Sequence, residues 1–311
     1  MLLTLAALIT LAATTPAGTT PPGPAALSQS EADSVRPFLE KDREETRKWL
    51  KSSPTSYLAT VQRVEYLFRT RLSIGRDAPN DVRLDDPAVR PEHLLVTVVG
   101  DSFRVEAQDD SARFKVKDAE LRTATLGPST ITVGRFLLRL SHQRYPAIIV
   151  FDPQSPRFAT YKGIDYFPVD FAWRYVLPLT PNPRADTIVI VSTRGFQRRA
   201  VRVGWFDFMA GDTRCRLEAD RLLEPGVGEH DIAVFFRDET TGKETYAVGR
   251  YLDPVALPDG RYVLDFNLAY NPACAYSEHY NCPIPLRTNR LKVAVRAGEK
   301  DLHYLDHAEG P

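Results

Sequence analysis

The sequence lacks an excess of charge of either sign. Its 311 residues include 40 Lys and Arg and 40 Asp and Glu, which give a formal net charge of zero at pH 7. A chain without a net charge exerts no long-range attraction on a polyanion such as DNA or RNA. We therefore expect no nucleic-acid partner.

The sequence also lacks an apolar run long enough to cross a bilayer at its N-terminus. The apolar stretch from Leu2 to Ala13 covers about twelve residues, whereas a spanning helix needs roughly twenty. Such a stretch is typical of a secretory signal peptide, and small residues precede a possible cleavage near Gly18. We expect residues 1–17 to be a signal peptide, the mature chain to have no transmembrane helix, and the protein to be periplasmic or secreted.

Common catalytic and nucleotide-binding signatures are missing as well. The chain has no Gly-x-Ser-x-Gly, His-Glu-x-x-His, Walker or Gly-x-Gly-x-x-Gly motif. These motifs mark serine hydrolases, zinc proteases and nucleotide-binding proteins. No cofactor and no metal site is predicted.

Cysteine is scarce, with three residues in the whole chain. Cys274 and Cys282 lie in one Pro- and Asn-rich loop, and a disulfide that closes so short a loop is worth roughly 2.5 kcal/mol. Export favours this disulfide, because oxidising compartments preserve such bonds. A metal clip that adds His279 and a catalytic thiol are the alternatives. Cys215 alternates with charged neighbours and is expected to be a buried, inert thiol.

The N-terminal part after the signal peptide predicts a linker and one helix. Residues 18–30 contain the Pro- and Gly-rich stretch GTTPPGPAALS, which is typical of a linker. Residues 31–52 place apolar side chains at helical spacing and end at Ser-Ser-Pro. An amphipathic helix that docks on the following domain is expected.

From Tyr57 onward the apolar residues alternate with a period of two, which indicates β-strands. Strands such as LLVTVV, SFRVEA and AIIVFD predict a β-sandwich over residues 55–155. A second series, from WRYVLPL to LKVAVRAG, predicts another all-β domain, a barrel or a sandwich, over 165–300, followed by a tail over 301–311. The fold class is therefore mainly β.

The stretch IGRDAPNDVRLDDPAVRPEH resembles the opening of a forkhead-associated (FHA) domain. Gly75 and Arg76 form the Gly-Arg turn of that family, and His93 ends its Val-x-x-x-His corner. In that family the arginine and a serine contact a phosphothreonine, and here Arg90 stands at the serine position. The resemblance implies an FHA-like sandwich in which Arg76 and Arg90 are candidate anion-binding residues.

A broader resemblance covers most of the mature chain. The blocks YKGIDYFPVD, VFFRDETTGKETYAVGRYL and LDFNLAYNPACAYSEHYNCPIPLRTNRLKVAVRAGE are similar to the bacterial domain-of-unknown-function family 1684. That family carries no established activity, so the resemblance implies a fold and leaves the function open.

Polar and phenolic residues gather in one strand and its loop near the C-terminus, with two more on a strand expected to pair nearby. Such a group can bind a small polar ligand or perform acid–base chemistry. We take three as catalytic candidates and five as ligand-binding candidates. The catalytic candidates are Asp265, Tyr276 and Glu278, and the ligand-binding candidates are Glu244, Arg250, Asn267, Asn271 and Tyr280.

Two functions from different classes follow from these features. The first is an exported binding or interaction module for a small polar ligand or a cell-envelope component, which fits the paired β-domains and the missing catalytic motifs. The second is a hydrolase-like enzyme that uses the carboxylates and tyrosines of the C-terminal loop. A shared pocket for Asp265, Tyr276 and Glu278 favours the enzyme, and scattered side chains favour the binding module.

Overall fold

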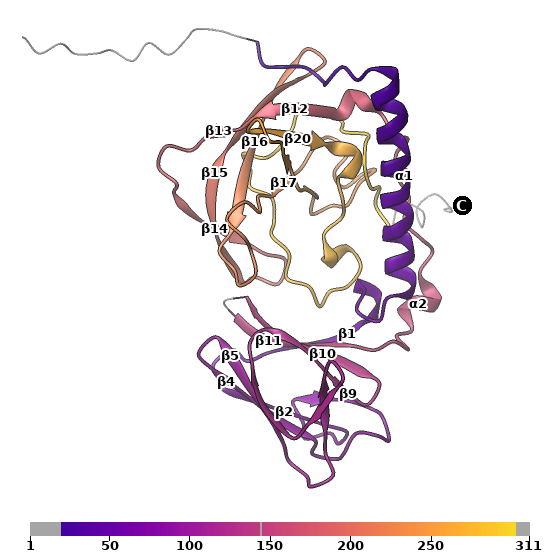
Figure 1. The fold of residues 1–311 in the computed structure, drawn as a ribbon, viewed down its shortest axis with the longest axis vertical. Helices are drawn as coiled ribbons and strands as arrows, with labels where there is room; N and C mark the ends of the chain where they lie inside the picture. The colour runs from indigo at the N-terminus through magenta and orange to yellow at the C-terminus, as the bar shows by residue number, and fades with distance from the viewer. Residues whose placement is uncertain (1–19, 144, 303–311) are drawn as a thin grey trace, which may run out of the picture.

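The computed structural model describes residues 20–143 and 145–302. It confirms the predicted fold class: the protein is mainly β, with one long N-terminal helix, a β-sandwich and further β-sheets in the C-terminal part. In Figure 1 the sandwich lies below the C-terminal domain, and helix α1 runs along one side of that upper domain. The predicted signal peptide and most of the predicted tail lie outside the described residues.

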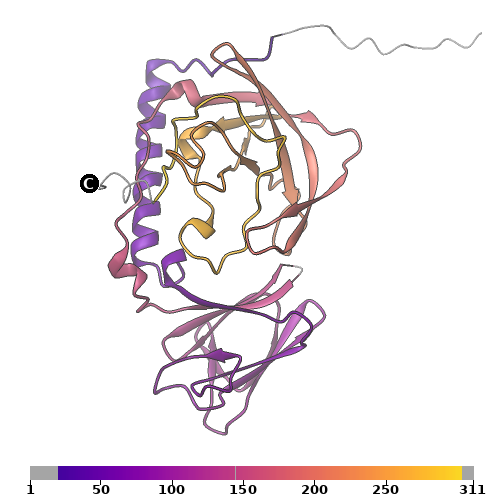
Figure 2. The ribbon, with the colours of Figure 1, turned by 180° about the vertical axis from the view of Figure 1, so that it is seen from behind.

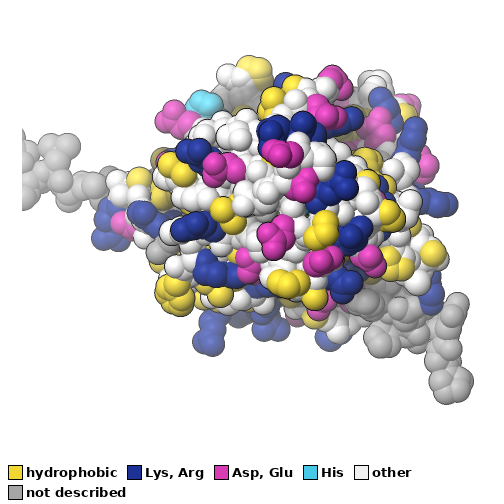
Figure 3. Space-filling view, turned by 90° about the horizontal axis from the view of Figure 1, so that it is seen from below, with side chains coloured by type: hydrophobic (Ala, Val, Ile, Leu, Met, Phe, Trp, Pro, Cys, Tyr) yellow, Lys and Arg dark blue, Asp and Glu magenta, His cyan; other side chains and the backbone are white. Residues whose placement is uncertain are grey.

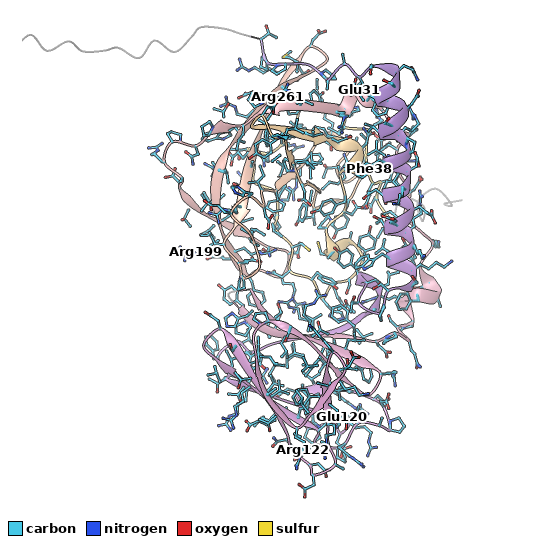
Figure 4. The ribbon with its side chains drawn as sticks, viewed as in Figure 1. Glu31, Phe38, Glu120, Arg122, Arg199 and Arg261 are labelled. Carbon is cyan, nitrogen blue, oxygen red and sulfur yellow. The ribbon has the colours of Figure 1, made fainter. Side chains whose placement is uncertain are left out.

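Helix α1 (Gln29–Ser52) begins at a reciprocal cap. The Ser28 side chain accepts a hydrogen bond from the backbone N–H of Glu31, and the Glu31 carboxylate accepts one from the backbone N–H of Ser28 at 2.8 Å. This pair satisfies two N–H groups that the start of a helix leaves free; Glu31 is labelled there in Figure 4. Leu50 packs against Tyr276, so the helix docks on the C-terminal domain, whereas the sequence predicted docking on the sandwich that directly follows it. Within the described residues, no helix combines the length and the apolar character needed to cross a membrane.

The sandwich consists of two sheets whose strands are almost all antiparallel. The first has the order β1-β11-β10-β9-β6-β7 and the second the order β3-β2-β4-β5-β8. The strands of the first are β1 (Thr60–Glu65), β6 (Phe114–Val116), β7 (Ala119–Leu121), β9 (Ser129–Val133), β10 (Phe136–Gln143) and β11 (Tyr145–Phe151). Those of the second are β2 (Arg71–Gly75), β3 (Val82–Arg83), β4 (Leu94–Val99), β5 (Ser102–Ala107) and β8 (Thr123–Leu126).

Alternation along each strand builds the core of this sandwich. On β4, Leu94 and Val96 are buried and the residue between them is partly exposed. On β5, Phe103 and Val105 are buried and the residue between them is exposed. Because successive side chains of a strand point to opposite faces, this pattern fills one face of the sheet with apolar groups. The facing sheet contributes Leu138 and its neighbours to the same core.

The described part of the C-terminal domain contains three smaller sheets. A hairpin of two long strands, β15 and β16, dominates it and is prominent in Figure 1. The sheets have the orders β12-β20-β19, β13-β15-β14 with β16 added to β15, and β17-β18. Their strands are β12 (Arg174–Pro178), β13 (Thr180–Pro181), β14 (Thr187–Val191), β15 (Gln197–Ala210), β16 (Thr213–Leu222), β17 (Val234–Phe236), β18 (Arg250–Leu252), β19 (Val255–Ala256) and β20 (Arg261–Asp265).

An aromatic core lies between these sheets, and the short helices of the chain lie outside them, next to the ends of longer elements. Phe208 and Phe266 pack in that core with ring centroids 5.8 Å apart, and Tyr175 lies 4.7 Å from Phe208. The short helices are η1 (Tyr57–Ala59), α2 (Arg157–Thr160), η2 (Phe171–Trp173), η3 (Phe266–Leu268) and η4 (Ala273–Ala275).

The segment after β20, residues 266–302, contains no strand in its described length, although the sequence predicts one at LKVAVRAG. That prediction is wrong because a side chain takes the place of a partner strand. Arg250 donates hydrogen bonds to the carbonyl oxygens of Val295 at 2.8 Å, Ala297, and Glu299 at 3.2 Å. The segment lies between α1 and the sheets of the upper domain, as both views show (Figures 1 and 2).

Polar contacts join the sandwich to the C-terminal domain. The Thr60 hydroxyl lies 2.7 Å from the Tyr280 hydroxyl, and Arg194 donates to the Glu65 carboxylate at 3.1 Å. The lower end of the molecule, away from this boundary, mixes basic and acidic side chains across its surface (Figure 3).

Candidate ligand-binding site

A cavity of about 370 Å³ lies between α1 and the C-terminal segment. Its described lining contains acidic, amide and aromatic side chains and no Lys, Arg or His. We call it the α1 pocket. Its lining includes Asp42, Trp49, Tyr57, Tyr166, Asp253, Asn267, Tyr270, Asn271, Tyr276 and Glu299.

Glu299 is the buried carboxylate of the α1 pocket, with 4% of its surface exposed. It accepts hydrogen bonds from the backbone N–H of Asn271 at 2.6 Å, from the Tyr276 hydroxyl at 3.3 Å and from the Tyr166 hydroxyl at 3.4 Å. Burial raises the pKa of Glu299 to about 7, and these donors act against the rise. Removal from water disfavours the charged form of a carboxyl group. The group therefore changes its protonation near neutral pH.

Asn271 supplies the second polar feature of the α1 pocket. Its side-chain N–H donates to the carbonyl of Lys300 at 2.7 Å, which fixes the amide. Its Oδ1 is buried and has no hydrogen-bond partner among the described residues. A buried acceptor left unsatisfied costs about 1–3 kcal/mol, so a ligand that donates a hydrogen bond here gains affinity.

Aromatic rings form the rest of the wall of the α1 pocket. The Tyr57 ring lies 4.9 Å from Trp49 and 5.4 Å from Tyr276, measured between centroids. On the helix side, the Arg43 guanidinium stacks 4.8 Å from the Tyr166 ring centroid. Stacking on α1 thus positions the Tyr166 hydroxyl that reaches Glu299.

The three predicted catalytic residues are not brought together. Asp265 accepts hydrogen bonds from Arg174 at 2.6 Å and from the Asn267 side chain at 2.8 Å, which ties down the start of η3. Tyr276 lines the α1 pocket, whereas the Glu278 side chain is exposed. This scatter favours binding over the acid–base chemistry that the sequence left open.

The five predicted ligand-binding residues divide between two cavities and the protein framework. Asn267 and Asn271 line the α1 pocket, and Tyr280 lines a different cavity at the domain boundary. Glu244 pairs with Arg296 at 2.9 Å outside the α1 pocket. Arg250, only 1% exposed, pairs with Asp238 at 2.8 Å and holds the C-terminal segment through its carbonyl groups.

The predicted disulfide is not formed in the structure, where Cys274 and Cys282 are free thiols. A hydrogen-bond network holds the loop instead: the backbone N–H of Cys274 donates to Sγ of Cys282 at 3.2 Å, and the Tyr246 hydroxyl lies 3.8 Å from Sγ of Cys274. Hydrogen bonding from Cys282 is the main cause that lowers the pKa of Cys274 to about 7. The paired thiols therefore share one proton near neutral pH.

The structure also shows the surroundings of Cys215 and tests the alternative metal site with His279. Cys215 is buried on β16, and burial raises the pKa of its thiol, in keeping with an inert role. In the part of the chain that the structure describes, no group of three His, Cys, Asp or Glu side chains lies at metal-binding distances. His279 thus does not join Cys274 and Cys282 as a third ligand.

The FHA-like loops bring the two candidate anion-binding arginines close together. The backbone N–H of Arg76 donates to the carbonyl of Arg90 at 2.9 Å, and a Cβ on Gly75 would lie 2.1 Å from the carbonyl oxygen of Pro91. His93 accepts from the backbone N–H of Arg90 at 3.0 Å and contacts the carbonyl of Arg113 at 2.7 Å. His93 therefore ties the loops together, and glycine is needed where they approach.

Sequence reasoning missed several residues of the α1 pocket. Glu299 is the chief example, together with Tyr57, Tyr166 and the helix residue Asp42. A lone glutamate at the end of the apolar stretch LKVAVRAGE is the one local signal for Glu299. The others belong to elements far apart in sequence, so no spacing pattern connects them.

The fold defines a class of protein in which an FHA β-sandwich is joined to a second β domain that contains a pocket. The FHA domain family matches residues 72–131. The family described as "Protein of unknown function (DUF1684)" matches residues 159–300. The chain belongs to the DUF1684 family and carries an FHA domain ahead of the DUF1684 region, as the sequence predicted.

Several solved structures have parts similar to this chain. An uncharacterized protein from gene locus rrnAC0354 of Haloarcula marismortui is 33% identical, with 47% of this chain and 83% of that chain covered and a TM-score of 0.38. The FhaA FHA domain, solved in complex with the intracellular domain of Rv3910, is 20% identical over 25% of this chain and 78% of that chain, with a TM-score of 0.20. Mycobacterium tuberculosis EmbR, solved with a low-affinity phosphopeptide, is 14% identical over 40% of this chain and 32% of that chain, with a TM-score of 0.21. No curated protein matches the chain.

Proposed function

We propose that the protein is a binding protein that holds a small polar ligand in the α1 pocket. One observation carries this proposal: the buried carboxylate of Glu299 lies beside the unpartnered Oδ1 of Asn271 in a cavity of about 370 Å³. Ligand sites are concave and place a few polar groups among apolar walls. The α1 pocket has this composition.

The lining favours a ligand that carries an amine. Asp42, Asp253 and Glu299 are all acidic, and the rings of Trp49 and Tyr57 stand beside them. Cations bind well over the faces of aromatic rings and against carboxylates. Since Glu299 ionises near pH 7, binding of an amine strengthens as the pH rises through this value.

Calorimetric titration with a panel of small amines, such as ethanolamine, putrescine and agmatine, tests this function. Glu299→Gln removes the charge and keeps the size of the side chain, and we expect affinity to fall about ten-fold or more because a charged acceptor is lost. Glu239→Gln, at an exposed carboxylate of the same domain, is the matched control and leaves affinity unchanged. Equal affinities for the native protein and Glu299→Gln contradict the proposal.

A second candidate function is phosphothreonine-peptide binding by the FHA domain. It is favoured by the contact between the Arg76 and Arg90 loops, which presents two arginines on neighbouring turns. Guanidinium groups suit phosphate because they donate paired hydrogen bonds. Fluorescence titration with a phosphothreonine peptide and its unphosphorylated form tests it, with Arg76→Ala abolishing the difference and Arg104→Ala, on exposed β5 surface, retaining it.

We also propose that the protein is exported, on the strength of the apolar segment from Leu2 to Ala13. An exported binding protein meets small solutes and cell-envelope components directly. Cell fractionation with N-terminal sequencing of the full chain tests this. Recovery of the uncut chain in the cytoplasm contradicts it.

A further inference from the structure

A second cavity, of about 280 Å³, lies at the boundary between the FHA sandwich and the C-terminal domain. The sandwich contributes side chains from β1, β10 and β11, and the C-terminal domain contributes β15 and the loop that contains Tyr280. Figure 4 labels Arg199, which follows a lining residue on β15, at the end of the C-terminal domain nearest the sandwich. We call this space the boundary cavity.

Positive charge gathers around the boundary cavity. Arg63 pairs with Glu65 at 2.9 Å, and Glu65 also pairs with Arg194 at 3.1 Å. Arg198 forms a two-point ion pair with Glu224. Three guanidinium groups line the cavity, those of Arg63, Arg139 and Arg198, and Arg194 joins the cluster through Glu65. The four arginines of this cluster outnumber its two carboxylates, Glu65 and Glu224, by two positive charges.

Arg139 carries the clearest uncompensated charge. It lies on β10, lines the cavity, and stacks 4.8 Å from the centroid of the Phe151 ring. Among the described residues, the Arg139 guanidinium has neither a hydrogen-bond acceptor nor a carboxylate within ion-pairing distance. A half-buried guanidinium without such a partner keeps all five donor hydrogens for something else.

The electrostatics of neighbouring groups agree with this arrangement. Burial lowers the pKa of Arg63, Glu65 acts against that effect, and the positive charges of Arg194 and Arg198 add to it. Burial raises the pKa of the Tyr280 phenol, whereas Arg139 and Arg63 act to lower it. The arginines thus influence one another and the phenol across one space.

From this geometry we infer that the boundary cavity is a binding site for a small oxyanion of charge near −2, with Arg139 as its principal contact. The two uncompensated charges match a phosphate group, and arginine binds such groups through paired hydrogen bonds. The volume suits inorganic phosphate or the head group of a small phosphomonoester. Tyr57 and Tyr280 supply phenols beside it.

The charged groups of this site differ from those of the sites already described. Arg76 and Arg90 lie in loops that flank β2 and β3, whereas Arg139 lies on β10 in the other sheet. The α1 pocket has no basic side chain in its described lining. It therefore favours a positively charged ligand, whereas the boundary cavity favours a negatively charged one. The inference therefore stands independently of the proposed amine site.

Titration calorimetry of the full chain at low ionic strength tests the oxyanion site, with inorganic phosphate and glycerol 3-phosphate as separate probes. We expect saturable binding of phosphate that weakens at least ten-fold in Arg139→Met. Arg71→Met, at an exposed arginine on β2 of the same domain, leaves the affinity unchanged. Tighter binding of glycerol 3-phosphate than of phosphate identifies a phosphomonoester as the ligand, and equal binding identifies the free ion.

Arg139→Lys separates a folding effect from a binding effect, because lysine keeps the charge but loses the paired donors. A folded Arg139→Lys protein, checked by thermal unfolding, should bind phosphate more weakly than the native chain and more tightly than Arg139→Met. Glu299→Gln should bind phosphate normally, which keeps this result distinct from the amine site. Absence of phosphate binding to the native chain, or equal binding by native chain and Arg139→Met, overturns the inference.

Discussion

The FHA sandwich buries mostly apolar side chains, whereas the C-terminal domain buries charged and amide groups beside its aromatic core. In the sandwich, His93 and Ser141 are among the few buried polar residues, and the backbone is satisfied by strand pairing. In the C-terminal domain the buried polar residues include Arg250, Asp238 and Asn271, which bond to a segment without strands. A domain with few strand ladders must satisfy its buried backbone groups with side chains.

The largest expected effect comes from breaking this side-chain support. Arg250→Met leaves Asp238 as an unpaired buried charge and frees the carbonyls of residues 295–299, so we expect a loss of about 3–5 kcal/mol in the free energy of unfolding. Chemical denaturation measures it. Arg261→Met, at the exposed pair with Asp259 (Figure 4), should change stability by less than about 0.5 kcal/mol. A loss under 1 kcal/mol for Arg250→Met, on the order of an ordinary hydrogen bond, contradicts the comparison.

In the sandwich, we expect stability to depend on substitutions that leave a cavity in the apolar core, not on the loss of a buried charge. Leu138 is fully buried on β10, so Leu138→Ala is expected to cost about 3 kcal/mol. Hydrogen exchange should show faster opening of β9 to β11 in this variant, and unchanged exchange there in Arg250→Met. The exposed Val99 gives the control, since Val99→Ala removes little buried surface. Loss of protection in both domains after either substitution shows that they unfold as one unit.

The buried polar groups also make the C-terminal domain sensitive to pH. Because the pKa of Glu299 in the folded protein, about 7, exceeds its usual value, the folded state holds this proton more tightly than the unfolded chain. The stability of the native protein relative to Glu299→Gln should therefore fall as the pH rises from about 4.5 to 7, by up to about 3 kcal/mol. Urea unfolding of both proteins at several pH values measures the difference. A constant difference across this range contradicts the raised pKa.

The smallest effect on stability is expected at the cysteine pair, where reactivity is the sharper measure. The pKa of Cys274 is lowered to about 7, whereas that of Cys215 is raised by burial. Iodoacetamide labelling followed by mass spectrometry should show Cys274 reacting first, with a midpoint near pH 7, because the thiolate is the nucleophile. If non-reducing digestion instead yields a peptide in which Cys274 is linked to Cys282, the disulfide that the sequence predicted is present and the free thiols are contradicted.

The sequence predicted the sandwich and α1 well because their signals are local. LLVTVV and SFRVEA became β4 and β5, and the helical spacing before Ser-Ser-Pro became α1. Each pattern reports which face of an element is buried, and nearby residues suffice to determine it.

The C-terminal segment and the α1 pocket could not be predicted from local sequence patterns in the same way. LKVAVRAG has the alternation of a strand, but its carbonyl groups are taken by Arg250, about forty-five residues earlier in the chain. Glu299 acquires its environment from Tyr166, Asn271 and Tyr276, whose positions depend on the folded domain. No periodicity reports such long-range side-chain partners.

Tyr57 and Tyr270 line both the α1 pocket and the boundary cavity, so the two spaces share a wall. Tyr57 also belongs to the short turn η1 that leads from the helix into the first strand of the sandwich. A ligand that shifts this ring in one cavity changes the free energy of binding in the other. Thermodynamic reciprocity requires the factor to be the same in both directions, so an amine and an oxyanion that meet at this wall would each act as the other's effector.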